Sequence, residues 1–276
     1  MNPKATSVTS RLCRFRELVN VDGMIDVLPF LITIAAIFLL AGFIKGVIGL
    51  GLPTISVSLL AAAMPPGKAL AIVIVPAIVT NIWQTFVGPH LLDIVRRLWP
   101  LMIGTAAGIW LNAGAMSGPS ARYGTILLGL LIVTYAVTGL TSFTFHVARA
   151  HEKWVGGIVG LVTGVISASS GVQVIPSVPF VQAIGMEKDE LVQALGVFFT
   201  VATLALGVTL THSGLLNSAT ALPGAVAMGC SFAGVFIGLA VRSSMPEECF
   251  RRWFLIAMIF LGLYLAGSAI YQSHLA

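Results

Sequence analysis

The sequence predicts an all-α, polytopic membrane protein made of two tandem homologous repeats of broken and full transmembrane helices. Of its 276 residues, 57% are hydrophobic and 9% are charged, with a mean hydropathy of +0.99, whereas a soluble domain carries roughly a quarter charged residues. No Asp, Glu, Lys or Arg occurs in residues 154–186 or 191–241, and one helical crossing needs only about 20 apolar residues. The two halves of the chain also repeat one order of segments.

Apolar runs define the predicted elements in chain order. They cover 28–49, 52–64, 69–88, 98–116 and 123–145 in the first half, then 154–168, 171–184, 191–211, 218–241 and 253–271 in the second. The runs are rich in Gly and Ala, and small residues let membrane helices approach one another closely. They lack the period-two alternation of a membrane β-barrel. We therefore expect a compact helical bundle.

The charged segments between these runs set the predicted boundaries. Residues 1–27 form a basic N-terminal extension that lacks the short apolar core and cleavage site of a signal peptide. Residues 28–145 form the first transmembrane repeat. An inter-repeat loop, 146–153, leads to the second repeat at 154–272.

The repeat is most visible where each half opens. "GFIKGVIGLG" from Gly42 matches "GLVTGVISAS" from Gly160, with two glycines, a valine and an isoleucine at the same spacing. Lys45 of the first copy stands opposite Thr163 of the second. "GKAL" then parallels "KDEL", and a long apolar helix follows each.

The orientation of the repeats depends on the short runs after each Gly-rich break. An odd number of crossings in each repeat makes the halves inverted, and an even number makes them parallel. Basic residues do not decide between them, because both topologies place eight on one side and six on the other. We prefer the inverted arrangement, because the runs 52–64 and 171–184 are short for full crossings.

Tandem repeats with Gly-interrupted segments in matching positions are the sequence sign of a transporter whose site lies where the broken helices meet. The alternative is that the glycines only permit close packing. At a site of this kind, unpaired backbone N–H groups and polar side chains can bind an anion. The predicted substrate-binding residues are Lys45, Gly49, Gly51, Thr54, Asn81, Gln84, Ser167, Ser169, Ser170, Gly171, Gln173 and Thr200.

Lys45 has two interpretations. A helix that starts at Leu28 places it roughly 25 Å along, where a lysine can snorkel to the far interface. Its repeat-mate Thr163 lies about 14 Å into its own helix, near the midplane of a roughly 30 Å core. By symmetry Lys45 then faces a cavity, because an unpaired charge toward lipid is costly.

These motifs resemble the sulfite exporter TauE/SafE family of membrane permeases over roughly residues 28–272. The family signature is a "GxxxGxxGxGGG" run that leads to a proline, once in each half. Here the copies read "GFIKGVIGLGLP", ending at Pro53, and "GLVTGVISASSGVQVIP", ending at Pro176. The helix after "GKAL", "AIVIVPAIVTNIWQTFVG", carries the polar Asn81 and Gln84.

The resemblance implies a secondary transporter, not an enzyme, that exports sulfite or an organosulfonate such as sulfoacetate by alternating access, in a multi-pass fold in the cell inner membrane. It implies no cofactor, and no cysteine pair suggests a metal site. The expected partners are a small anionic substrate and the lipid bilayer, with no nucleic acid. A homodimer is an option that the sequence does not decide. An uptake permease for another organic anion and an accessory membrane subunit are the alternatives.

Overall fold

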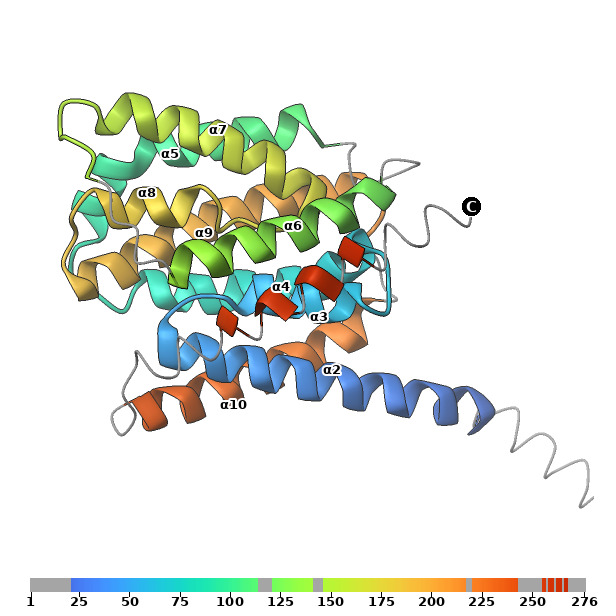
Figure 1. Ribbon diagram of the computed structural model, residues 1–276. Helices are drawn as coiled ribbons and strands as arrows, with labels where there is room; N and C mark the ends of the chain where they lie inside the picture. The colour runs from blue at the N-terminus through green and yellow to red at the C-terminus, as the bar shows by residue number, and fades with distance from the viewer. Residues whose placement is uncertain are drawn as a thin grey trace, which may run out of the picture.

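The computed structural model describes residues 21–113, 121–140, 146–216 and 220–242, with short helical pieces between residues 255 and 267. This part of the chain is helical and contains no strand, which confirms the predicted all-α class. The helices (Figure 1) are α2 (Val21–Ile48), α3 (Leu52–Ala61), α4 (Pro66–Thr85), α5 (Leu91–Leu111), α6 (Ala121–Leu140), α7 (Glu152–Ser170), α8 (Ser177–Ala183), α9 (Lys188–His212) and α10 (Ala221–Arg242).

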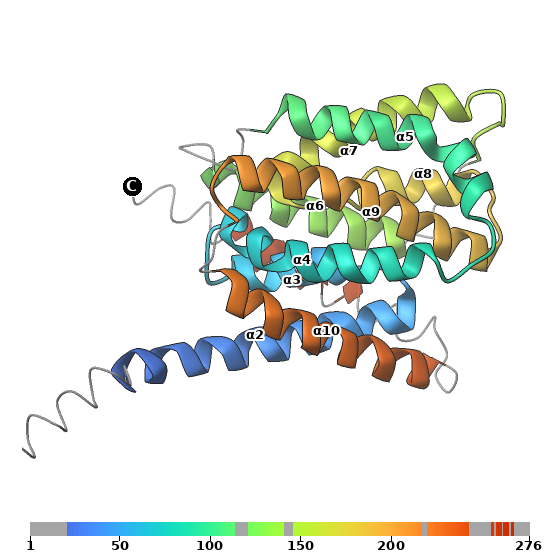
Figure 2. The ribbon, with the colours of Figure 1, turned by 180° about the vertical axis from the view of Figure 1, so that it is seen from behind.

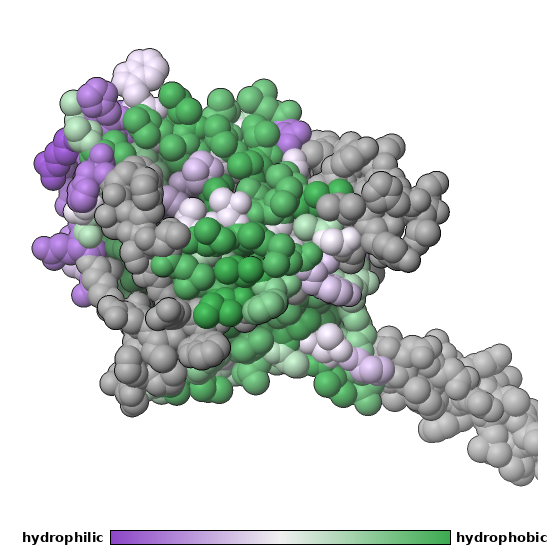
Figure 3. All heavy atoms as spheres, viewed as in Figure 1, coloured by the Kyte–Doolittle hydropathy of each residue, from purple (hydrophilic) through white to green (hydrophobic). Residues whose placement is uncertain are grey.

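Within the described residues, five helices are long and apolar enough to cross a membrane. These spans are Leu28–Val47, Gly67–Thr85, Glu152–Ser170, Asp189–His212 and Ala221–Val241. Large apolar side chains also point outward, among them Ile32 (59% exposed), Ile103 (60%) and Phe236 (59%). Figure 3 shows apolar side chains over most of the visible face and hydrophilic ones gathered at the end where α7 begins. The chain is a multi-pass membrane protein.

The helix bounds differ from the apolar runs at the N-terminal end and within the two short runs. Helix α2 begins at Val21, inside the predicted N-terminal extension, and residues 1–20 lie outside the described residues. The runs at 52–64 and 171–184 contain only α3, of 10 residues, and α8, of 7 residues. At 1.5 Å per residue, α3 and α8 span about 15 and 10 Å, too little for a hydrocarbon core of roughly 30 Å.

The helices are arranged in three layers, which the front and rear views agree on (Figures 1 and 2). Helices α5 and α7 pack together on one outer side, and α2 and α10 pack together on the other. Helices α4 and α9 lie in contact between these pairs. The spans on α4 and α9 are each 67% buried, compared with 33–44% for those on α2, α7 and α10, so these two helices form the centre of the bundle.

Glycines bring each outer pair close together. A Cβ at Gly42 of α2 would lie 2.2 Å from the Ser231 carbonyl oxygen of α10. A Cβ at Gly160 of α7 would lie 2.2 Å from the Leu101 carbonyl oxygen of α5. Only a residue without a side chain permits such a backbone approach, which is how small residues stabilise packed membrane helices.

Candidate functional site

The first helix break separates α2 from α3 at Gly49–Gly51. Gly49 and Gly51 have φ values of 86° and 106°, in the left-handed region that glycine adopts without steric cost. Pro53 follows in the first turn of α3, where the missing N–H of proline is tolerated. The chain therefore stops one helix and starts another within three residues, inside the bundle.

Lys45 lies one turn before this break and is only 5% exposed. Its Nζ donates hydrogen bonds to Asn81 Oδ1 at 2.5 Å and Thr80 Oγ1 at 3.1 Å, both on α4. Among the described residues, no carboxylate lies within 4.0 Å of Nζ. Only neutral oxygens therefore hold this ammonium group among the described residues. A buried charge without an opposite charge is costly. The Lys45 side chain lines a cavity, as one interpretation expects, but it lies in the last turn of α2 and not near the middle of a span.

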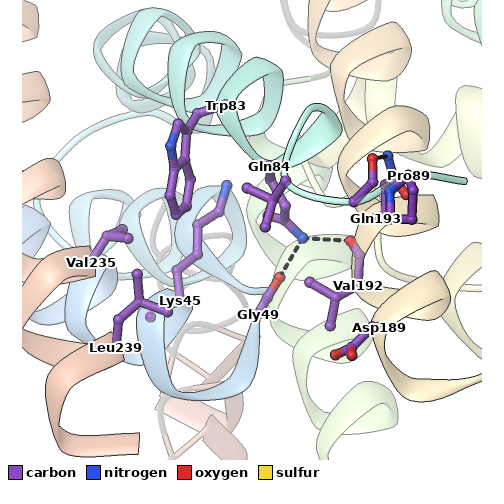
Figure 4. Close-up of a pocket in the computed structure, with 13 residues that line it drawn as sticks. Lys45, Gly49, Trp83, Gln84, Pro89, Asp189, Val192, Gln193, Val235 and Leu239 are labelled. Atoms are coloured by element: carbon purple, nitrogen blue, oxygen red, sulfur yellow. Dashed lines mark hydrogen bonds between the residues drawn. The ribbon is translucent and has the colours of Figure 1, made fainter. Parts of the chain in front are cut away.

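That cavity is a pocket of about 360 Å³, where the ends of α2, α4 and α10 meet the start of α9. Lys45 and Gly49 line it from α2, Trp83 and Gln84 from α4, and Asp189 from α9. In the close-up of Figure 4, the Lys45 side chain extends beside Trp83 toward Gln84. The pocket thus combines a buried cation, a helix break and an aromatic wall.

Two glutamines fix the walls of this pocket. Gln84 Nε2 donates to the carbonyl oxygens of Gly49 at 2.9 Å and Val192 at 2.8 Å, which joins α4 to the first break and to α9 (Figure 4). Gln193 Nε2 donates to the Thr85 and Gly88 carbonyl oxygens at 2.9 and 2.6 Å. Because Gln84 satisfies carbonyl groups of the first break and of α9, and Gln193 those at the end of α4, the two side chains hold the backbone of the pocket in place.

The second break lies between α7 and α8 and is organised by hydroxyl groups. Gly171, with φ 75°, ends α7. Ser167 Oγ lies 2.6 Å from the Thr163 carbonyl oxygen and 3.0 Å from that of Val172, beyond the break. Ser170 Oγ is 2.9 Å from the Ile166 carbonyl oxygen and accepts a bond from the Val172 N–H at 3.2 Å. These serines therefore satisfy the backbone of the break itself.

Gln173 follows this break and is 2% exposed, yet neither its Nε2 nor its Oε1 has a hydrogen-bond partner among the residues that the structure describes. Ser56 Oγ of α3 and Asn81 Nδ2 are likewise buried and unpartnered. Buried polar atoms are nearly always hydrogen-bonded, and each exception calls for an explanation.

The predicted residues fall into two groups. Lys45, Gly49, Asn81 and Gln84 are joined by contacts around the first break, and Ser167, Ser170, Gly171 and Gln173 lie at the second. Within the described chain, no hydrogen bond joins one group to the other.

The remaining predicted residues have separate positions. Gly51 caps α3, and Thr54 is buried in its first turn. Ser169 turns to α5, where Asn112 Nδ2 donates to its Oγ at 2.8 Å. Thr200 Oγ1 lies 3.0 Å from Thr85 Oγ1 between α4 and α9.

The sequence prediction missed Asp189, Gln193 and Trp83, which line the pocket, and also Ser56 and Ser231, whose buried hydroxyl groups have no partner among the described residues. Asp189 and Gln193 are one helical turn apart at the start of an apolar run, the only sequence sign that they share a face. Among the described residues, no group of three or more His, Cys, Asp or Glu side chains could hold a metal ion.

The helices, the two breaks and the charged pocket together define a multi-pass helical membrane protein with a polar site inside its bundle. The family model described as "Sulfite exporter TauE/SafE" matches residues 34–265, so the chain belongs to this family, as the sequence motifs predicted. No curated protein and no solved structure gives a significant match. Family membership indicates transport of sulfite or another small anion across a membrane, in agreement with the prediction that the chain is not an enzyme.

Proposed function

We propose that the chain is a secondary transporter that exports a small sulfur-containing anion, sulfite or an organosulfonate such as sulfoacetate, across the cell inner membrane. The observation that carries the proposal is Lys45, a buried cation that lines a pocket at a helix break. Ionisable residues within membrane spans are rare and mark substrate or ion pathways. Its described partners are neutral oxygens, so an anionic ligand would supply the opposite charge that the ammonium group lacks.

The proposed site lies between the two breaks. At the first, Lys45 supplies the positive charge and Asn81 Nδ2 a free donor. At the second, Gln173 Nε2 supplies another donor without any existing bond to break. An anion that leaves water must replace its lost hydrogen bonds, and buried unpartnered donors do this at little cost.

The proposal includes two inverted repeats that alternate access to this site. In its support, α2 ends at the end of the bundle where α7 begins (Figure 1). Gly42 and Gly160, aligned in the sequence, each face the backbone of a helix from the other half. Each break also packs against the opposite half, Gly49 against Val192 and Gly171 against Leu70. Rocking one repeat against the other is the usual way such folds alternate access.

The energy for export can come from the membrane potential. Moving one negative charge outward through 100 mV is favourable by about 2.3 kcal/mol. Asp93 is the only Asp or Glu between residues 27 and 151. The first predicted repeat therefore has few of the carboxyl groups that usually carry a proton relay. We therefore expect flux to follow the potential more strongly than the pH gradient.

A flux assay with the full chain in liposomes tests the proposal. Liposomes loaded with sulfite or sulfoacetate are assayed with and without an imposed potential and, separately, a pH gradient, against protein-free liposomes. We expect protein-dependent efflux that rises with an inside-negative potential. Failure to move or bind either anion would refute the proposed function.

A further inference from the structure

The pocket beside the first break is lined by two opposite charges that do not touch. Lys45 contributes an ammonium group from α2, and Asp189 contributes a carboxylate from the first turn of α9. Their charged atoms lie more than 4.0 Å apart, and within the described residues Asp189 has no ion pair or hydrogen-bonded partner. Figure 4 places the two side chains on opposite sides of Gly49 and Val192.

The two charges also differ in depth. Gly49 and Val192 mark a common level, because a Cβ at Gly49 would lie 3.5 Å from Val192 Cγ2. Lys45 is four residues before Gly49 on a helix that runs toward this end, and Asp189 is three residues before Val192 on a helix that starts here. At 1.5 Å per residue, their backbones are separated by about 10 Å along the bundle. Lys45 is the deep group and the exposed Asp189 lies at the mouth.

The size of the pocket favours a substrate longer than sulfite. Water takes about 30 Å³ per molecule in the liquid, so 360 Å³ corresponds to about twelve such volumes. Sulfite has four heavy atoms and leaves most of this space unfilled. A bare oxyanion at Lys45 also leaves the Asp189 carboxylate without a counter-charge, which repels the anion as it enters.

We propose that the pocket selects a zwitterion, an ω-amino sulfonate of two or three carbons, with its sulfonate at Lys45 and its ammonium group at Asp189. The inference rests on the proposed function, since it uses Lys45 as the anion-binding group, but a zwitterion has no net charge, so its flux would not follow the membrane potential as that of sulfite would. A zwitterion satisfies both charges at once and fills more of the pocket. Asp189 is then the residue that sets specificity, by discriminating on a positive charge at the far end of the substrate.

Glu190 offers a matched control. It is the next residue of the same helical turn and carries the same charge, but it does not line the pocket. If Asp189 acted only by its favourable position at the start of α9, Glu190 would have the same effect, because acidic residues there interact alike with the helix dipole.

The test is isothermal titration of the full chain in detergent with 3-aminopropanesulfonate and 3-hydroxypropanesulfonate, which are similar in size and differ in one charge. We expect the wild type to bind the amino compound about three- to fivefold more tightly, the magnitude of an exposed ion pair. Asp189→Asn abolishes the difference by weakening the amino compound alone, whereas Asp189→Glu and Glu190→Gln keep it. Continued binding of the hydroxy compound shows that Asp189→Asn is folded.

Two results would overturn the inference, and they are distinguishable. If both sulfonates bind through Lys45 but equally well, or if Asp189→Asn leaves their ratio unchanged, the zwitterion selectivity is wrong and anion transport stands. If neither these compounds nor sulfite and sulfoacetate bind, the proposed function fails and the selectivity fails with it.

Discussion

The two helix breaks are built with opposite chemistry. At the first, Gln84 uses its amide nitrogen to hold the carbonyl oxygens of Gly49 and Val192, and a charged Lys45 lines the open pocket beside it. At the second, Ser167 and Ser170 satisfy the backbone, and Gln173, which follows the break, has no partner within the described part of the chain.

At each break, one set of side chains holds the backbone and a different polar side chain does not. In the first half an amide holds the backbone and a lysine is available, while in the second half hydroxyls hold the backbone and an amide is available. Both halves therefore contain a broken helix, but different residue types hold the backbone at the two breaks. A site between such halves is asymmetric, with its charge on one side only.

The largest expected effect comes from removing that charge. Lys45→Met keeps the length and apolar stem of the side chain but deletes the ammonium group. Hydrogen bonds to charged groups contribute about 1.5–3 kcal/mol, so we expect anion affinity, measured by titration calorimetry, to fall about 10- to 100-fold. Lys68→Met, at an exposed position of α4, is the control and leaves affinity unchanged. Unchanged affinity in Lys45→Met would assign Lys45 a structural role.

The two glutamines give the sharpest contrast. Gln173→Leu removes two unpartnered polar atoms from a buried site, so we expect thermal stability in detergent to stay level or rise while anion flux falls about tenfold, as for one lost hydrogen bond to an anion. Gln84→Leu leaves the Gly49 and Val192 carbonyl groups without their donor, and we expect it to cost about 1–3 kcal/mol. If Gln173→Leu were the less stable variant, an unseen partner would hold Gln173.

The glycines of the two breaks should respond alike. Gly51→Ala and Gly171→Ala force a Cβ into a left-handed conformation, at φ 106° and 75°, and we expect each to lower stability by about 1–2 kcal/mol. Gly157→Ala is the control, since it lies inside α7 with nothing within 4 Å of the added Cβ, and it should stabilise the helix slightly. Equal melting temperatures for all three variants would contradict the need for glycine at the breaks.

The sequence allowed much of the fold to be predicted for simple reasons. Long apolar runs indicated membrane helices because length and composition alone determine them. Glycine and proline together marked the first break, and Gly51 and Pro53 lie at the start of α3 as that pattern indicates. The start of α2 at Val21 was missed because Asp22 and Asp26 interrupt the apolar run without ending the helix.

The composition of the pocket could not be predicted in the same way. Gln84 reaches Val192 across 108 positions of sequence, and Gln193 reaches Thr85 across the same separation. Such contacts depend on how α4 packs against α9, which periodicity in either helix does not specify. The same holds for Asp189, which enters the pocket because α9 starts beside the first break.

The smallest effect is expected at Ser169, where the prediction grouped two adjacent serines at the second break. Successive residues of a helix point about 100° apart, so Ser169 and Ser170 do not share a face. Ser169 bonds Asn112, the residue that caps α5. Ser169→Ala should therefore change the free energy of unfolding by less than about 0.5 kcal/mol and leave the anion flux nearly unchanged. Ser167→Ala removes the hydroxyl that reaches Val172 across the break and should cost about 1 kcal/mol. A larger loss of flux in Ser169→Ala than in Ser167→Ala would mean that the substrate path runs between α5 and α7 rather than past the break.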